Sequence, residues 1–125
     1  MRLTLRRMAL AGSGLTFFAI AIAALAAPRV VAAQYHVALD GPVNFNEFRA
    51  VFSGFWLGLA GTMLLAARRP QERLLGDCCG LMIGFQATAR LVSFALDGVP
   101  DVKFVGVAVL ELVSAALILA GRSAT

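Results

Sequence analysis

Four long apolar runs, separated by short charged segments, account for most of this 125-residue chain. They cover residues 8–27, 47–67, 74–96 and 104–120. A helix needs about 20 predominantly apolar residues to cross the hydrocarbon core of a bilayer. The pattern therefore predicts an all-α membrane protein, with four transmembrane helices in a single multi-pass domain over residues 1–125.

The composition argues against a soluble fold of this size. Hydrophobic residues make up 60% of the chain, whereas soluble domains contain about 45–50%. A small domain buries only part of the surface that its unfolded chain exposes. Lipid must therefore solvate much of the apolar surface.

The first run also fits a second interpretation, a cleaved secretory signal. Arg2, Arg6 and Arg7 precede it, and residues 24–26 (Ala-Leu-Ala) resemble a cleavage site. The apolar core of a signal spans about 7–15 residues, whereas this run has twenty. We therefore expect a retained helix, with cleavage as the alternative.

Turn and capping signals mark the ends of the runs. Residues 28–46 form the longest connection, which we expect to be a short interfacial helix or an extension of the first helix. Asn44 and Glu47 have the spacing of a capping box and predict the start of the second helix. Residues 68–70 (Arg-Arg-Pro) predict its end.

Basic residues cluster on one side of the predicted domain. With a cytoplasmic N-terminus, the cytoplasmic arginines are Arg2, Arg6, Arg7, Arg68, Arg69, Arg73 and Arg122. Only Arg29 and Lys103 then lie in the outer loops. Because cytoplasmic loops carry an excess of Lys and Arg, we expect both termini to be cytoplasmic. We expect the helices to form a left-handed antiparallel four-helix bundle.

Arg90 and Glu111 lie inside predicted helices, where a charge costs on the order of 3 kcal/mol on insertion scales. Arg90 comes seven residues before Asp97, which ends its run, and Glu111 comes seven residues after Phe104, which starts the next. At about 1.5 Å per residue, both lie roughly 10 Å below the same surface. A short turn makes the two helices antiparallel neighbours, so we expect an Arg90–Glu111 ion pair.

Asp77 lies near the predicted cytoplasmic end of the third helix, four residues after Arg73. We expect it to be a solvated charge at the start of that helix.

Further polar residues share the faces of the predicted ion pair. Three of them, Gln86, Ser93 and Asp97, follow helical spacing in one stripe with Arg90. Two more start the second helix from the same outer side. Arg49 either reaches toward Glu111 or extends to the lipid head groups. We predict a polar pocket in the outer half of the bilayer, between the second, third and fourth helices. The candidate ligand-binding residues are Glu47, Arg49, Gln86, Arg90, Ser93, Asp97 and Glu111. The alternative is that Arg90 and Glu111 form only a structural clamp.

Two rows of glycines predict close helix packing, because small residues let membrane helices approach one another. The rows are Gly76, Gly80 and Gly84 in the third run, and Gly54, Gly58 and Gly61 in the second.

The sequence lacks signals for catalysis, metal binding and nucleic-acid binding. His36 is the single histidine, and Cys78 and Cys79 are adjacent rather than spaced as C-x-x-C. No phosphate-binding loop or nucleophile motif occurs. The net charge of +4 comes without a basic helix face or an aromatic platform. We therefore expect no catalytic residue, metal, resident cofactor or nucleic-acid partner.

Three segments together resemble a known family. Residues 46–59 (NEFRAVFSGFWLGL) are similar to the pattern N-E-[IFL]-R-A-x-[YF]-G-G-x-x-[LI]-G. Residues 89–100 (ARLVSFALDGVP) resemble G-R-x-x-S-x-x-x-D-G-x-P, and residues 111–112 resemble a closing E-L. Ser53 and Ala89 depart from the patterns where glycine is usual, but both are small. The chain resembles the bacterial membrane family catalogued as domain of unknown function number 4345, with an architecture similar to DoxX-like proteins.

The resemblance implies a four-helix protein of the bacterial inner (cytoplasmic) membrane, without an established activity. It marks as signature positions Glu47, Arg49, Arg90, Asp97 and Glu111. Three functions stay open. The first is binding of a membrane lipid, quinone or other amphiphile in the polar pocket. The second is an accessory role beside a membrane-protein partner or in a homo-oligomer, and the third is a DoxX-like membrane redox subunit.

Overall fold

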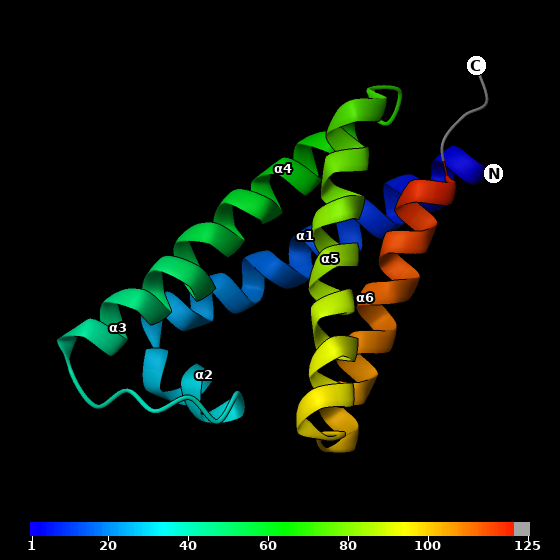
Figure 1. Cartoon of the computed structure of the whole chain (residues 1–125). Coiled ribbons are helices and arrows are strands. Elements are labelled where there is room, and N and C mark those ends of the chain that lie inside the picture. The colour runs from blue at the N-terminus through cyan, green and yellow to red at the C-terminus, as the bar shows by residue number, and fades with distance from the viewer. Residues whose placement is uncertain (122–125) are drawn as a thin grey trace.

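The computed structural model describes residues 1–121, which form helices joined by short connections (Figure 1). Arg122 and the predicted cytoplasmic C-terminus lie outside the described residues. In chain order, the elements are α1 (Arg2–Ala26), α2 (Pro28–Gln34), α3 (Pro42–Phe48), the π-helix η1 (Arg49–Phe55), α4 (Trp56–Arg68), α5 (Arg73–Asp97) and α6 (Val102–Ala120).

Four helical segments are long and apolar enough to cross a membrane. They are Arg2–Ala26, the continuous helix Pro42–Arg68, Arg73–Asp97 and Val102–Ala120. The predicted all-helical fold with four membrane-length helices is confirmed. The orientation of the termini stays a prediction.

The second long helix begins earlier than predicted, and its predicted cap is wrong. The helix starts at Pro42, with Gly41 at the N-cap position. Proline suits the first helical turn because its missing N–H would have no intrahelical partner there. Asn44 therefore lies inside the helix, and its side-chain amide donates a hydrogen bond to the Ala38 carbonyl at 3.3 Å.

The connection after α1 contains a short separate helix. Of the two predicted forms, a short helix or an extension of the first long helix, the structure has the short helix. Pro28 starts α2 directly after the break at Ala27, because proline has no N–H to continue the hydrogen bonds of α1. His36 follows with a φ angle of 55° and turns the chain out of the helix.

The π-helical stretch η1 was not predicted, and it aligns a ladder of aromatic rings. Its hydrogen bonds span five residues instead of four, so side chains four residues apart lie almost above one another. Phe48 and Phe52 stack with ring centroids 4.5 Å apart, and Phe52 and Trp56 are 4.7 Å apart. Phe17 of α1 meets Trp56 edge to face at 5.3 Å, which joins α1 to this helix.

The long helices form two antiparallel pairs, α1 with α4 and α5 with α6, which diverge from a shared end (Figure 1). We call the end with the start of α1 and the residue 69–72 loop the terminal end, and the other the α2 end. The buried residues of α5 are Gly76, Cys79, Gly80, Ile83 and Ala87, so the last ten residues of the helix contain no buried residue. The predicted left-handed bundle is not confirmed, because the pairs form a fork rather than an evenly closed bundle.

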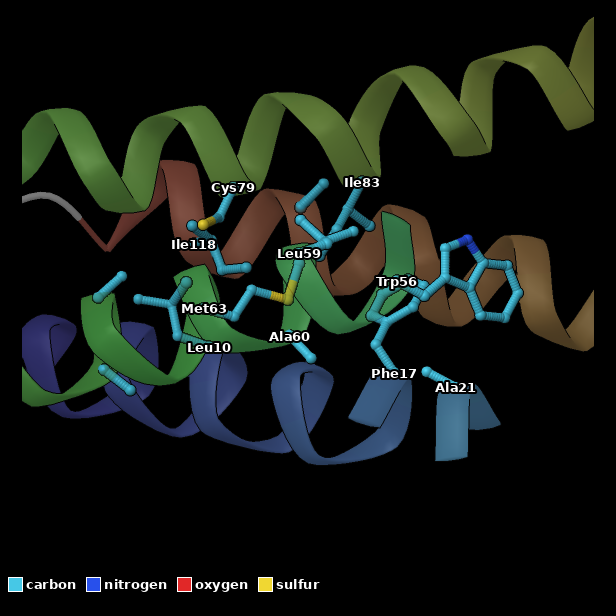
Figure 2. Close-up of a cluster of buried hydrophobic side chains, with 13 residues drawn as sticks. Leu10, Phe17, Ala21, Trp56, Leu59, Ala60, Met63, Cys79, Ile83 and Ile118 are labelled. Atoms are coloured by element: carbon cyan, nitrogen blue, oxygen red, sulfur yellow. The ribbon is translucent and has the colours of Figure 1, made fainter. Parts of the chain in front are cut away.

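The apolar core joins the two pairs near the base of the fork. Figure 2 shows side chains from all four long helices pointing toward one another there, among them Leu10, Met63, Cys79 and Ile118. These four side chains are fully buried. Dispersion contacts of this kind hold membrane helices together, since lipid supplies little hydrophobic drive between them.

The glycine row of α5 packs inside the protein, as predicted. A Cβ atom on Gly80 would lie 2.9 Å from side-chain atoms of Ile118 and Leu119 on α6. At Gly84, one turn along, the nearest atom to such a Cβ would be the Cβ of Ala115 at 3.7 Å, an ordinary contact. The α6 side chains therefore leave no room for a side chain at Gly80, whereas Gly84 has room for a methyl group.

We expect Gly80→Ala to destabilise the protein by about 1–3 kcal/mol, because the added methyl group overpacks the α5–α6 contact. Gly84→Ala is the matched control, and its effect should stay within about 0.5 kcal/mol. Unfolding of both variants in detergent micelles measures the difference. Equal stability of the two variants would contradict this packing.

Candidate ligand cavity and the two ion pairs

The predicted ion pair between Arg90 and Glu111 is present, and it joins α5 to α6. Nε of Arg90 donates to Oε2 of Glu111 at 2.8 Å, and Nη2 donates to Oε1 at 3.1 Å. The amide of Gln86, one turn before Arg90, also donates to Oε1 at 2.7 Å. Equal spacing from the α5–α6 turn brings the two charges to the same level, as the sequence predicted.

Gln86 and Arg90 supply hydrogen bonds to both carboxylate oxygens of Glu111, and Arg90 still has N–H groups that donate to no residue in the described part of the chain. Both oxygens of Glu111 accept hydrogen bonds, and the side chain is buried. The planar guanidinium of Arg90 uses one edge for Glu111, so its remaining N–H groups point away from the carboxylate. Among residues 1–121, Nη1 of Arg90 has no hydrogen-bond partner. The pair carries no net charge, yet it can still donate.

A cavity of about 330 Å³ lies beside this cluster, in the fork between the helix pairs. Gly12, Ser13 and Thr16 of α1 line one wall, and α6 lines another. Arg90 and Glu111 are the charged residues of its lining, which is otherwise mostly apolar. A cavity thus lies beside the predicted ion pair, but the predicted placement between the second, third and fourth helices alone is wrong, because α1 forms a wall. Its position in the outer half of a bilayer stays a prediction.

Tyr35, which is not among the predicted site residues, also lines the cavity. Its ring contacts Phe52 at 5.0 Å, Phe104 at 6.0 Å and Trp56 at 6.2 Å, between centroids. Burial raises the pKa of Tyr35, the Arg90 charge lowers it and the Glu111 charge raises it, with burial the largest effect. The phenol therefore keeps its proton at neutral pH and can donate it to a hydrogen bond.

The seven predicted site residues do not all meet. Gln86, Arg90 and Glu111 line the cavity. Ser93 donates a hydrogen bond to Asp97 at 2.9 Å, and both line a separate hollow that reaches Arg90 from the α5–α6 turn.

The two predicted residues of the second helix lie elsewhere. Glu47 lines a hollow beside Val37 and Phe48. The guanidinium of Arg49 lies over the ring of Phe45, 5.5 Å from its centroid, and is exposed. Neither residue lines the cavity, so the expectation that Arg49 reaches toward Glu111 is wrong.

A second ion pair at the terminal end corrects the expectation for Asp77. Nη2 of Arg6 lies 3.1 Å from Oδ1 of Asp77, and the Arg6 side chain is only 1% exposed. The same Nη2 donates to the Arg73 carbonyl at 2.8 Å. Asp77 is therefore part of a buried link between α1 and α5, not a solvated charge.

Gly76 makes room for this second pair. A Cβ atom there would collide with the guanidinium of Arg6, with Cζ only 2.9 Å away. The buried face of α1 repeats with helical spacing and already includes Arg6, followed by Leu10, Gly14, Phe17, Ala21 and Ala24. Arg6 is thus in register with the buried face, but the other faces of α1 are apolar as well, so the sequence pattern did not signal its burial.

The described lining of the cavity offers few groups that could act as nucleophile, acid or base. Glu111 is the only His, Cys, Asp or Glu residue among the cavity-lining residues, and no cluster of three such residues occurs within residues 1–121. The hydroxyl groups of Ser13, Thr16 and Ser114 lie in the lining without a histidine or free carboxylate to activate them. The arrangement offers a polar end and an apolar body.

We expect Asp77→Asn to destabilise the protein by about 3–5 kcal/mol, because it leaves the buried charge of Arg6 uncompensated. The matched control is Glu72→Gln, which breaks the exposed pair with Arg69 near the same end and should cost about 0–1 kcal/mol. Unfolding in micelles compares the two. A small, equal loss in both variants would show that the Arg6–Asp77 link contributes little.

Comparison with known proteins identifies the family but supplies no activity. The family model described as domain of unknown function (DUF4345) matches residues 5–121. No curated protein and no solved structure matches the chain. The matched region includes both ion pairs and the whole cavity lining. The chain therefore belongs to the DUF4345 family.

Proposed function

We propose that this protein binds a membrane amphiphile in the cavity of the fork. The polar end of the ligand lies against Gln86, Arg90 and Glu111, and its chain runs along the apolar walls of α1 and α6. The observation that carries the proposal is the cavity itself, which places one hydrogen-bonding cluster at the edge of a mostly apolar lining. Ligand sites commonly combine an apolar lining with a few oriented polar groups.

The size and position of the cavity favour a ligand with a tail. A volume of about 330 Å³ is at the low end for small-molecule sites and holds only a head group with the first part of a chain. Met8 and Leu110 line the cavity and are 64% and 68% exposed. They mark a mouth between α1 and α6 that faces the apolar surface, through which the rest of a tail extends into lipid.

The same ion pair also serves as a clamp, and the two roles are compatible. Pairing lets both charges stay within apolar helices, and it fixes the register of α5 against α6. A clamp alone does not require unused donors beside an open cavity. The leftover N–H groups of Arg90 and the hydroxyl of Tyr35 therefore favour binding in addition to clamping.

A second candidate, packing against a membrane-protein partner or a second copy, rests on the glycine row of the second long helix. Gly54, Gly58 and Gly61 are exposed, and Cβ atoms on Gly58 and Gly61 would meet nothing within 4 Å. Small residues on an exposed face let another helix approach closely. Gly58→Leu should then abolish co-purification of the partner, whereas Gly12→Leu should not.

Trp56 offers a direct test of amphiphile binding. It is the only tryptophan, it lines the cavity, and it is 7% exposed. A diacylglycerol with brominated acyl chains should quench its fluorescence saturably in detergent micelles, because bromine quenches tryptophan on contact. Gly12→Leu should raise the apparent Kd from this quenching titration at least tenfold, about 1.4 kcal/mol of binding free energy. The reason is that the new side chain enters the cavity.

The matched control is Gly58→Leu. Both glycines are exposed helical positions with open space around an added Cβ, but Gly58 does not line the cavity. The probe should quench Trp56 fluorescence in Gly58→Leu as strongly as in the unchanged protein. Equal quenching in all three proteins would mean that bulk lipid, and not the cavity, supplies the bromine.

A further inference from the structure

We infer that the amphiphile carries an uncharged head group with oxygen acceptors, such as an ester or ketone carbonyl, rather than a phosphate, a carboxylate or an amine. This inference rests on the proposed function and narrows the class of ligand. It follows from the charge balance of the cavity and from the hydrogen bonds that its polar residues already make.

The charges that line the cavity are already matched. Within residues 1–121, Arg90 and Glu111 are the only charged residues that line the cavity, and they bind each other through two hydrogen bonds. An anionic head group at the spare N–H groups of Arg90 would place a second negative charge beside Glu111, with one cation for two anions. An amine would add a second cation beside one carboxylate. Either ligand leaves a desolvated charge unbalanced, which costs far more than a lost neutral hydrogen bond.

The groups left over are mainly donors. Arg90 keeps the N–H groups of Nη1, and Gln86 keeps one amide hydrogen, because only one points at Glu111. Tyr35 adds a phenolic hydroxyl that makes no hydrogen bond to residues 1–121 and lines the same cavity. These donors suit the lone pairs of a carbonyl oxygen, which accepts hydrogen bonds without bringing a charge.

Two pairs of brominated probes isolate the effect of charge. The first pair is a diacylglycerol and the phosphatidic acid with the same brominated chains. The second is a brominated fatty-acid methyl ester and the corresponding free fatty acid, titrated above its pKa. Within each pair the tail is constant, so a difference in Trp56 quenching reports the head group. The uncharged member should bind at least tenfold more tightly in both pairs.

Two variants connect this preference to named groups. Glu111→Gln removes the negative charge and leaves that of Arg90 unbalanced, so the preference should reverse toward the anionic member of each pair. Tyr35→Phe keeps the ring contacts and removes one hydrogen-bond donor. It should therefore lower the affinity for the uncharged probes by about two- to tenfold. Gly58→Leu serves again as the control with unchanged preference.

The outcomes separate this inference from the proposal beneath it. Tighter binding of the uncharged members supports it, and reversal in Glu111→Gln strengthens it. Equal binding, or a preference for the anions in the unchanged protein, overturns the head-group inference and leaves amphiphile binding in place. Quenching that Gly12→Leu does not reduce for any probe overturns the proposed function. Should Glu111→Gln fail to fold, the comparison in the unchanged protein still decides.

Discussion

A charge on a helix in an apolar environment persists only with a partner in the same protein, and the architecture of this chain depends on how two such charges are paired. Arg6 is buried on α1 and finds Asp77 on α5. Arg90 on α5 finds Glu111 on α6. The first pair ties the two halves of the fork together at the terminal end, whereas the second pair lies within one half. The ion pairs therefore hold the halves to each other at one end only.

The α2 end is closed by weaker contacts. Nζ of Lys103 donates to the backbone carbonyl of Gln34 at 3.3 Å and to its side-chain oxygen at 3.1 Å, and both side chains are exposed. The ring of Tyr35 bridges Phe52 and Phe104 above the cavity. Exposed hydrogen bonds and ring contacts contribute less than a buried ion pair. The two halves of the fork are thus held more strongly at the terminal end than at the α2 end, with the cavity between the two ends.

Much of the fold could be predicted from the sequence because it is local. The apolar runs predicted the long helices. Because the turn between α5 and α6 is short, the distance of Arg90 and Glu111 from that turn followed from the number of residues in between. The pairing of Arg6 with Asp77 joins residues 71 positions apart, and no turn geometry relates them. The π-helical turn before Trp56 and the arrival of Tyr35 from α2 likewise depend on packing between distant segments.

The wall that α1 contributes was missed for a different reason. In a soluble helix, the apolar face marks the core. In a membrane helix, the faces toward lipid and toward protein are both apolar, so periodicity alone does not separate them. Leu15 and Phe18 of α1 are exposed, whereas Leu10 and Phe17 are buried. Arg6 starts the buried face, but Arg2 and Arg7 start other faces of the same helix, so a basic residue does not mark it in the sequence either.

Native mass spectrometry of the protein, released directly from its own membrane, shows directly whether the fork holds an amphiphile. The unchanged protein, Gly12→Leu and Gly58→Leu are measured side by side. We expect a stoichiometric small adduct on the unchanged protein and on Gly58→Leu, and its loss from Gly12→Leu. Bare protein in all three samples, or an adduct that Gly12→Leu retains in full, would contradict amphiphile binding in the fork.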